Sequence, residues 1–131
     1  MIIFSPEIDG NEYFQHAEEE IVKVCGLDVN EYYNNKDILI KELWDKHFDK
    51  IVLAAIDVDV LVGSQTVGYL AMQIGGKLPT PIYSQILNHT EWEKDKTLGW
   101  EGNTIEQRKQ HLQEFREKLK AHYIQYMQKF E

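Results

Sequence analysis

An apolar stripe in the last third of the chain has a spacing that only a long helix places on one face. Its members recur three or four residues apart: Leu112, Phe115, Leu119, Tyr123, Tyr126 and Phe130. Asn103 and Glu106 precede the stripe at the spacing of a capping box, which marks a helix start. We therefore expect a helix of about 40 Å from Asn103 to the end of the stripe.

A second stripe lies near the N-terminus and predicts another amphipathic helix. It consists of Phe14, Ala17, Ile21 and Val24. Asn11 is a suitable N-cap and Gly26 a natural stop. Glu19 and Glu20 fall away from the stripe, so we expect them on an acidic outer face.

The segment "VNEYYNNKDILIKELWD", residues 29–45, places polar residues directly before large apolar ones. Asn34 or Asn35 can cap a helix whose first turn carries Asp37, where a negative charge favours the helix dipole. We expect one buried stripe along this helix, formed by Ile40, Leu43, Trp44 and His47. The charged residues would lie nearer solvent: Lys36, Asp37, Lys41, Glu42 and Asp45.

The middle of the chain is ambiguous. "IVLAAIDVDVLV", residues 51–62, is rich in β-branched residues and partly alternates, which suits a strand. "SQTVGYLAMQI" continues better as a helix, with Ser64 as a cap, and the whole stretch also fits one central helix. We favour the helical interpretation because helical patterns flank it. Gly75, Gly76 and Pro79 then break the chain.

Thr80 followed by Pro81 indicates a further helix start. The buried face of that helix is predicted to hold Ile82, Tyr83, Ile86 and Leu87. A polar connection follows, in which we expect Leu98 and Trp100 to be anchors. The predicted fold is a mainly α, single-domain bundle of about five helices spanning residues 1–131. A short strand at 1–4, at 51–60 or at both stays open, with an α/β fold as the alternative.

Charge is distributed unevenly along the 131 residues, whose net charge is −8. Residues 1–50 hold 12 acidic residues and 5 lysines, whereas residues 91–131 hold 8 of each sign. A net negative charge argues against direct binding of nucleic acid or of an anionic membrane. A one-sided acidic surface can instead steer a basic protein partner.

Location in the cell is predicted from three features. Cys25 is the single cysteine, so no intramolecular disulfide forms. The N-terminus lacks a basic segment followed by a long apolar run, and the longest apolar region is interrupted by Asp57 and Asp59. We expect a cytoplasmic protein without a membrane span.

Several short patterns resemble parts of chemical sites. Asp57 and Asp59 form an Asp-x-Asp pair that holds cations in some enzymes, but the pattern is common by chance. "GSQTVG" lacks the Lys and Ser/Thr of a phosphate-binding loop, and a helical zinc site would need two histidines four residues apart around a glutamate. The other patterns have simpler structural interpretations: Cys25, His47, the group His89, Glu91 and Glu93, and the pair His111 and Glu114. We therefore predict no catalytic residue, metal or cofactor.

The order "IDG", helix, then "EYYNNKDILIKELWD" resembles the first part of barstar-type ribonuclease inhibitors. The resemblance covers residues 8–46 and departs from that family at Asn34, at the spacing to Trp44 and in lacking a closing strand. It implies an intracellular inhibitor that blocks a toxin's active site with an aromatic, acidic surface. The resemblance implies that the following residues contact the partner: Tyr32, Tyr33, Asn34, Asp37, Glu42 and Asp45. The charge pattern adds Glu19 and Glu20 to the predicted partner-binding residues.

The sequence therefore favours an immunity protein that neutralises a basic bacterial toxin domain, with a nuclease as the expected toxin. Aromatic side chains anchor interfaces, and carboxylates can oppose catalytic cations. The first alternative is an acidic adaptor or nucleic-acid mimic that binds a DNA- or RNA-binding protein. The second is a small hydrolase with a site assembled from distant residues, centred on Asp57, Asp59 or His89.

Overall fold

In the computed structural model, residue 8 and residues 12–94 and 103–128 are described, without the side chains of 91–94 and 103–105. All regular structure in these ranges is helical, which confirms the mainly α class. The elements are α1 (Glu12–Val24), α2 (Val29–Asn34), the 3₁₀ turn η1 (Lys36–Ile38), α3 (Lys41–Lys46), α4 (Phe48–Val58), α5 (Val60–Ile74), α6 (Thr80–Lys94) and α7 (Asn103–Gln128). The expectations for residues 1–4, Asn11, Leu98, Trp100 and Phe130 lie outside the described residues.

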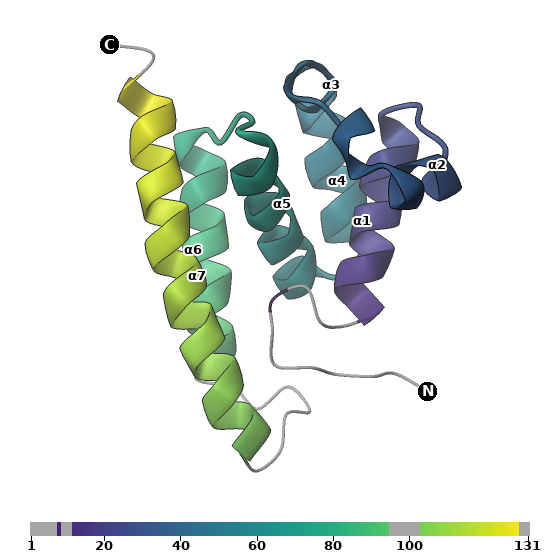
Figure 1. The fold of residues 1–131 in the computed structure, drawn as a ribbon. Coiled ribbons are helices and arrows are strands. Elements are labelled where there is room, and N and C mark those ends of the chain that lie inside the picture. The colour runs from purple at the N-terminus through teal and green to yellow at the C-terminus, as the bar shows by residue number, and fades with distance from the viewer. Residues whose placement is uncertain (1–7, 9–11, 95–102, 129–131) are drawn as a thin grey trace.

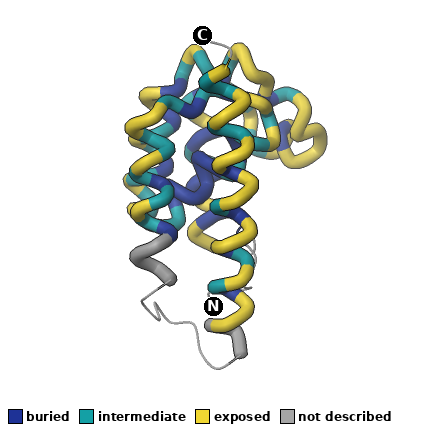
Figure 2. Tube along the Cα trace, turned by 90° about the vertical axis from the view of Figure 1, so that its left-hand side faces the viewer, coloured by how far each residue is buried: buried dark blue, intermediate teal, exposed yellow. Residues whose placement is uncertain are grey.

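The helices are arranged around α5 (Figure 1). The antiparallel neighbours α1 and α4 pack on one side of α5, and α6 and α7 pack on the other. The short elements α2, η1 and α3 lie beside α1 and α4. Figure 2 shows the dark blue buried positions gathered along the inside of this arrangement. None of the described helices is both long and apolar enough to cross a bilayer.

The central helix α5 is buried although it is not uniformly apolar. Its buried positions are Gly63, Ser64, Gln65, Thr66, Val67, Gly68, Leu70 and Ala71. Glycine at position 63 lets the backbone of α4 come close, because a Cβ there would collide with the carbonyl oxygen of Ala55. Gln65 accepts a hydrogen bond of 2.6 Å from the buried guanidinium of Arg108 on α7. The buried side chains of Gln65 and Arg108 are thus bonded to each other, as burial requires.

The strand considered for residues 51–60 is wrong, because the segment forms most of α4. Phe48, Ile51 and Ala55 are buried on one face at helical spacing, while Leu53 is 71% exposed. A strand would have placed Ile51, Leu53 and Ala55 on the same face. The helical spacing of the core positions prevails over the β-propensity of the β-branched side chains.

A single helix through residues 51–74 is also wrong. Asp59 is extended, with φ −165°, and its side chain accepts a 2.8 Å hydrogen bond from the backbone N–H of Val62. Asp59 therefore caps α5, and Ser64 does not. Ser64 lies inside the helix, where its hydroxyl donates to the carbonyl of Val60 at 2.7 Å.

The single helix expected after Asn34 or Asn35 is divided into η1 and α3. Asn35 is extended, and its side chain accepts a hydrogen bond from the backbone of Asp37, so it caps only the 3₁₀ turn. Ile40 is extended as well and 44% exposed. Of the expected stripe, Trp44 alone is fully buried, while Leu43 and His47 are half-buried.

The remaining helices lie where the sequence indicated. In α1, Phe14, Ala17 and Ile21 are buried, and Gly26 has a left-handed φ of 78° just beyond the helix end. Helix α6 begins at Thr80. The described part of the α7 stripe contributes Leu112, Phe115 and Leu119 to the core.

Candidate partner-binding surface

The segment from Asp28 to Lys46 is built from short capped elements. Asp28 accepts a 3.0 Å hydrogen bond from the backbone N–H of Glu31 and begins α2. Asn35 both ends α2 and caps η1. Isolated helices of six residues are unstable in water, so tertiary contacts must fix this segment.

The first contact is a buried tyrosine–carboxylate pair. Tyr32 is 2% exposed, and its hydroxyl donates to Glu18 Oε2 of α1 at 2.6 Å. Burial, followed by the bond to Glu18, raises the pKa of Tyr32 far above its ordinary value. Tyr32, which the resemblance placed in the partner interface, is therefore a core residue that holds α2 against α1.

Lys36 completes this cluster from η1. Its ammonium lies 3.6 Å from the same Glu18 oxygen and 5.7 and 5.6 Å from the ring centroids of Tyr32 and Tyr33. The Glu18 carboxylate is thus satisfied although the residue is only 5% exposed. The sequence interpretation missed both Glu18 and Lys36. The burial of Glu18 could have been predicted from the sequence, since Glu18 lies four residues after Phe14 and directly beside Ala17 on the buried face.

The second contact joins α3 to the turn after α5. Trp44 is fully buried, and its indole N–H donates to the Lys77 carbonyl at 3.1 Å. Asp45 Oδ1 accepts from the Lys77 backbone N–H at 2.8 Å, and its Oδ2 pairs with the Lys41 ammonium at 2.8 Å. The Asp45 carboxylate is therefore occupied within the molecule, contrary to its expected role toward a partner. A Cβ at Gly76 would overlap the indole ring, so this turn needs glycine.

The other predicted contact residues are at or near the surface. Tyr33 is 37% exposed, and its hydroxyl lies 3.5 Å from Glu19 Oε1. Burial and the acidic neighbours Glu18 and Glu19 raise the pKa of Tyr33 to about 12. Glu19 is half-buried, and the half-buried Glu20 pairs with Lys23 at 3.1 Å.

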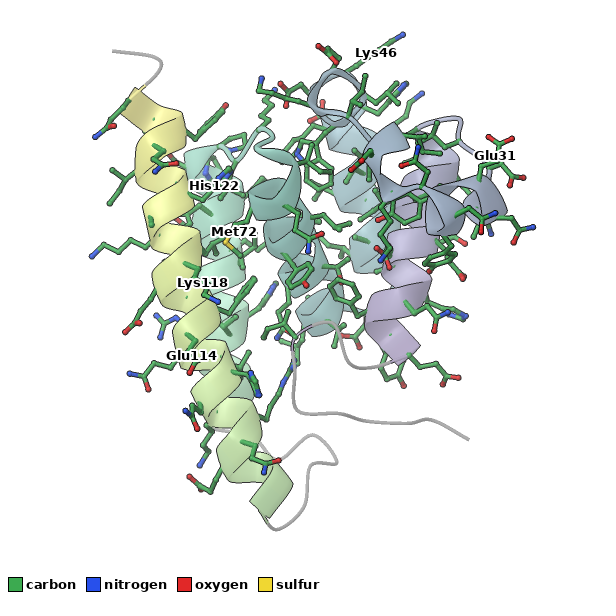
Figure 3. The ribbon with its side chains drawn as sticks, viewed as in Figure 1. Glu31, Lys46, Met72, Glu114, Lys118 and His122 are labelled. Carbon is green, nitrogen blue, oxygen red and sulfur yellow. The ribbon has the colours of Figure 1, made fainter. Side chains whose placement is uncertain are left out.

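Within the exposed part of this region we define the α2–α3 surface by six residues: Glu31, Tyr33, Asn34, Asp37, Ile40 and Glu42. The same segment also exposes Lys36, Lys41 and Lys46. Glu31 projects outward at the α2 side of the molecule (Figure 3). Among the described residues, the carboxylates of Glu31, Asp37 and Glu42 form no ion pair. The surface therefore presents three carboxylates without ion pairs beside an exposed tyrosine and an exposed isoleucine, although the charge of Glu42 acts on nearby Lys41.

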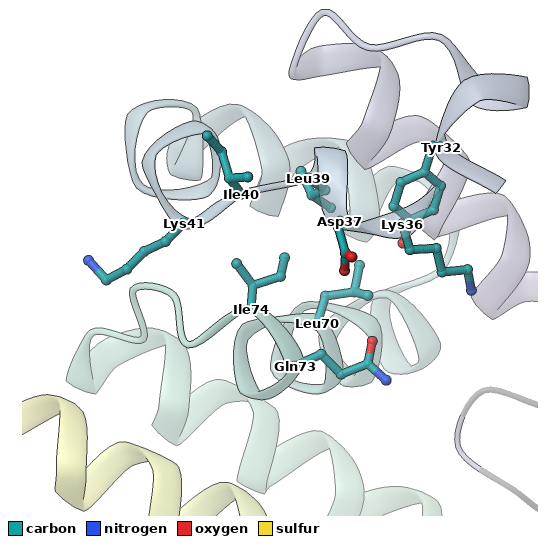
Figure 4. Close-up of a pocket in the computed structure, with 9 residues that line it drawn as sticks. All are labelled: Tyr32, Lys36, Asp37, Leu39, Ile40, Lys41, Leu70, Gln73 and Ile74. Carbon is teal, nitrogen blue, oxygen red and sulfur yellow. The ribbon is translucent and has the colours of Figure 1, made fainter. Parts of the chain in front are cut away.

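A pocket of about 550 Å³ opens at the edge of the α2–α3 surface (Figure 4). We call it the α5 pocket, because one wall is the C-terminal half of α5. Its lining residues are Tyr32, Lys36, Asp37, Leu39, Ile40, Lys41, Leu70, Gln73 and Ile74. The sequence pattern did not indicate it, because its two walls lie some thirty residues apart in the chain.

The structure also describes most of the residues in the short metal-like and thiol patterns. No group of three metal-ligating side chains converges among the described residues. Asp57 is exposed and Asp59 is used as a helix cap. Burial raises the pKa of Cys25 to about 11, so its thiol is protonated at neutral pH. The side chains of Glu91 and Glu93 lie outside the described residues.

His89 and Ser64 form a contact that bears on the hydrolase alternative. His89 Nδ1 lies 2.7 Å from Ser64 Oγ, but Ser64 is only 3% exposed and its hydroxyl also donates to Val60. A hydroxyl has only one proton to donate. Because the Ser64 hydroxyl donates it to the Val60 carbonyl, the His89 Nδ1–H is the donor to Ser64 Oγ. The arrangement ties α6 to α5 and holds the serine oxygen away from solvent.

We expect His89 to make stability depend on pH. Burial lowers the pKa of His89 below its ordinary value of 6.5, opposed by the charge of Asp59. The unfolded chain then binds more protons than the folded protein just below that value, so the free energy of unfolding falls as the pH falls. Urea unfolding at about pH 7.5 and about pH 5.5 should show a smaller loss for His89→Gln than for the unchanged protein. An equal loss in both would contradict this role.

Comparison with protein-family models, with curated proteins and with solved structures found no match. The described residues form a mainly α bundle that carries three exposed carboxylates without ion pairs and an adjoining pocket.

Proposed function

We propose that this protein is an inhibitor that binds and neutralises a basic toxin domain, in the manner of an immunity protein. One observation supports this most directly: Glu31, Asp37 and Glu42 are exposed without ion pairs on a segment fixed from beneath by buried contacts. A preorganised surface loses little entropy on binding, and its charges attract a basic partner at long range. The preferred partner is a nuclease toxin, whose active site uses cations to hold phosphates.

The test is protection of cells by co-expression. The toxin candidate is the product of the gene next to the one encoding this protein, and the unchanged protein should restore growth. The double variant Asp37→Lys/Glu42→Lys should fold normally but lose protection. Glu114→Lys/Glu117→Lys on α7 is the matched control, since it changes the net charge equally at exposed positions (Glu114 is labelled in Figure 3).

Three outcomes would overturn the proposal. These are an adjacent gene product without toxicity, a double variant that protects as well as the unchanged protein, and an equal loss of protection in both double variants. The last result would mean that net charge matters and the α2–α3 surface does not. A nucleic-acid mimic is distinguished by competition with DNA or RNA for the same target and by a steep loss of affinity with salt.

A further inference from the structure

The α5 pocket combines an apolar base with one carboxylate that has no ion pair among the described residues. Leu39 and Leu70 are 4% and 1% exposed, and Ile74 is half-buried beside them. In Figure 4, Leu70 and Ile74 point from α5 toward the segment that carries Asp37 and Ile40. An apolar base of this kind suits the methylene part of a long side chain.

The two lysines of the pocket are already paired. Lys36 is bound to Glu18 at 3.6 Å, and Lys41 is bound to Asp45 at 2.8 Å. In Figure 4 the Lys41 ammonium points away from the other lining residues. Asp37 has no such partner among the described residues, so its carboxylate is the charge that the pocket presents to a ligand. Gln73 adds an exposed amide from α5.

We propose that the α5 pocket receives an arginine side chain of the basic partner, whose guanidinium pairs with Asp37 while its methylenes cover Leu70 and Ile74. This inference rests on the proposed inhibitor function and specifies which side chain of the partner binds at the α5 pocket. It also differs from the expectation drawn from the resemblance. There, carboxylates project into the toxin; here, a side chain of the partner enters this protein.

Arginine is favoured over the other candidates on chemical grounds. Its planar guanidinium is weakly hydrated and can form two parallel hydrogen bonds with one carboxylate. Lysine offers a more strongly hydrated point charge, which is costlier to bring over an apolar base. A phosphate or other anion would need free lysines, and both are engaged with carboxylates.

The experiment needs no partner. The ¹⁵N-labelled protein is titrated with N-acetyl-arginine-N-methylamide and observed by two-dimensional NMR. N-acetyl-citrulline-N-methylamide, which has nearly the same shape without the charge, is the control ligand, and inorganic phosphate is the anionic one. We expect weak, saturable shifts with the arginine compound at the backbone amides of Asp37 and Ile40 and at the Gln73 side-chain amide. The citrulline compound should bind about fivefold more weakly, as loss of a partly exposed ion pair predicts.

Two variants test the assignment within the pocket. Asp37→Asn keeps the shape of the side chain and should weaken arginine binding about fivefold, whereas Asp49→Asn, an exposed acid on α4, should leave it unchanged. The proposal is overturned if no shift saturates, if citrulline binds as well as arginine, or if phosphate shifts the same amides more strongly. If the arginine compound does not bind but the protein still protects cells from the toxin, only the arginine pocket is rejected. Arginine binding without protection would reject the toxin-inhibitor function alone.

Discussion

Replacing Gly63 with alanine is expected to lower the free energy of unfolding by about 3 kcal/mol. The added Cβ would overlap the Ala55 carbonyl and press on the backbone nitrogen of Ile56. Backbone atoms cannot rotate away as side chains do, so α4 and α5 would have to separate along their contact. Urea unfolding followed by circular dichroism measures the change.

Gly68→Ala is the matched control on the same helix. Its Cβ would meet the tips of Leu119, Phe115 and Ile86 at 3.1, 3.1 and 3.3 Å. Side-chain tips can shift by a few tenths of an ångström, and alanine is favoured over glycine in a helix by up to about 1 kcal/mol. We expect a net change below about 1 kcal/mol. Equal destabilisation by both variants would contradict the close approach of α4 to α5 at Gly63.

Trp44→Ala should lower the free energy of unfolding by about 3 to 5 kcal/mol, the range for deleting a buried aromatic side chain. The indole is fully buried, contacts Phe48 edge-on at 6.0 Å between centroids, and donates to the Lys77 carbonyl. The hydrogen bond to Lys77 holds α3 beside the turn that follows α5, and Lys41 of α3 and Ile74 of α5 both line the α5 pocket. The variant should therefore also lose arginine binding although Asp37 is unchanged.

Trp44→Phe is the control for this prediction. It keeps an aromatic ring in the core and removes the hydrogen bond to Lys77, so we expect a loss of about 1 to 2 kcal/mol. Thermal unfolding ranks the three proteins, and NMR titration with the arginine compound reports the pocket. If Trp44→Ala unfolds at the same temperature as the unchanged protein, the indole does not fix α3 as described.

The sequence predicted those helices whose apolar residues keep a helical period along their whole length. The α1 and α7 stripes are of this kind, since Phe14, Ala17, Ile21 and Leu112, Phe115, Leu119 are buried as expected. The sequence-based prediction was wrong where apolar residues have helical spacing although the backbone does not form one continuous helix. Ile40, Leu43, Trp44 and His47 have helical spacing, yet extended backbone at Asn35 and Ile40 divides the segment. Asn35 was among the predicted caps, but nothing in the sequence indicated that its helix would end after one 3₁₀ turn. Asp59 gave no clear signal, because it is an ordinary polar residue until its side chain is seen capping α5.

The surface was predicted only in part, because burial within it depends on residues far away in the chain. Tyr33, Asn34, Asp37 and Glu42 are exposed, as a partner-binding role requires. Tyr32 and Asp45 are not free, because Glu18 and the Lys77 backbone bind them from 14 and 32 residues away. The α5 pocket depends in the same way on Leu70, Gln73 and Ile74 from another helix. No local pattern reports such pairings.

The most direct test of the central claim is the affinity of the neighbouring gene's product for this protein and for its Asp37→Lys variant, measured by calorimetry at physiological salt. We predict a loss of about 30-fold or more, because the charge reversal removes the ion pair and also places two positive charges opposite each other. Glu117→Lys, which changes the net charge equally on α7, should bind within about twofold of the unchanged protein. Equal affinity of the Asp37→Lys variant and the unchanged protein would contradict the claim that the α2–α3 surface binds the partner.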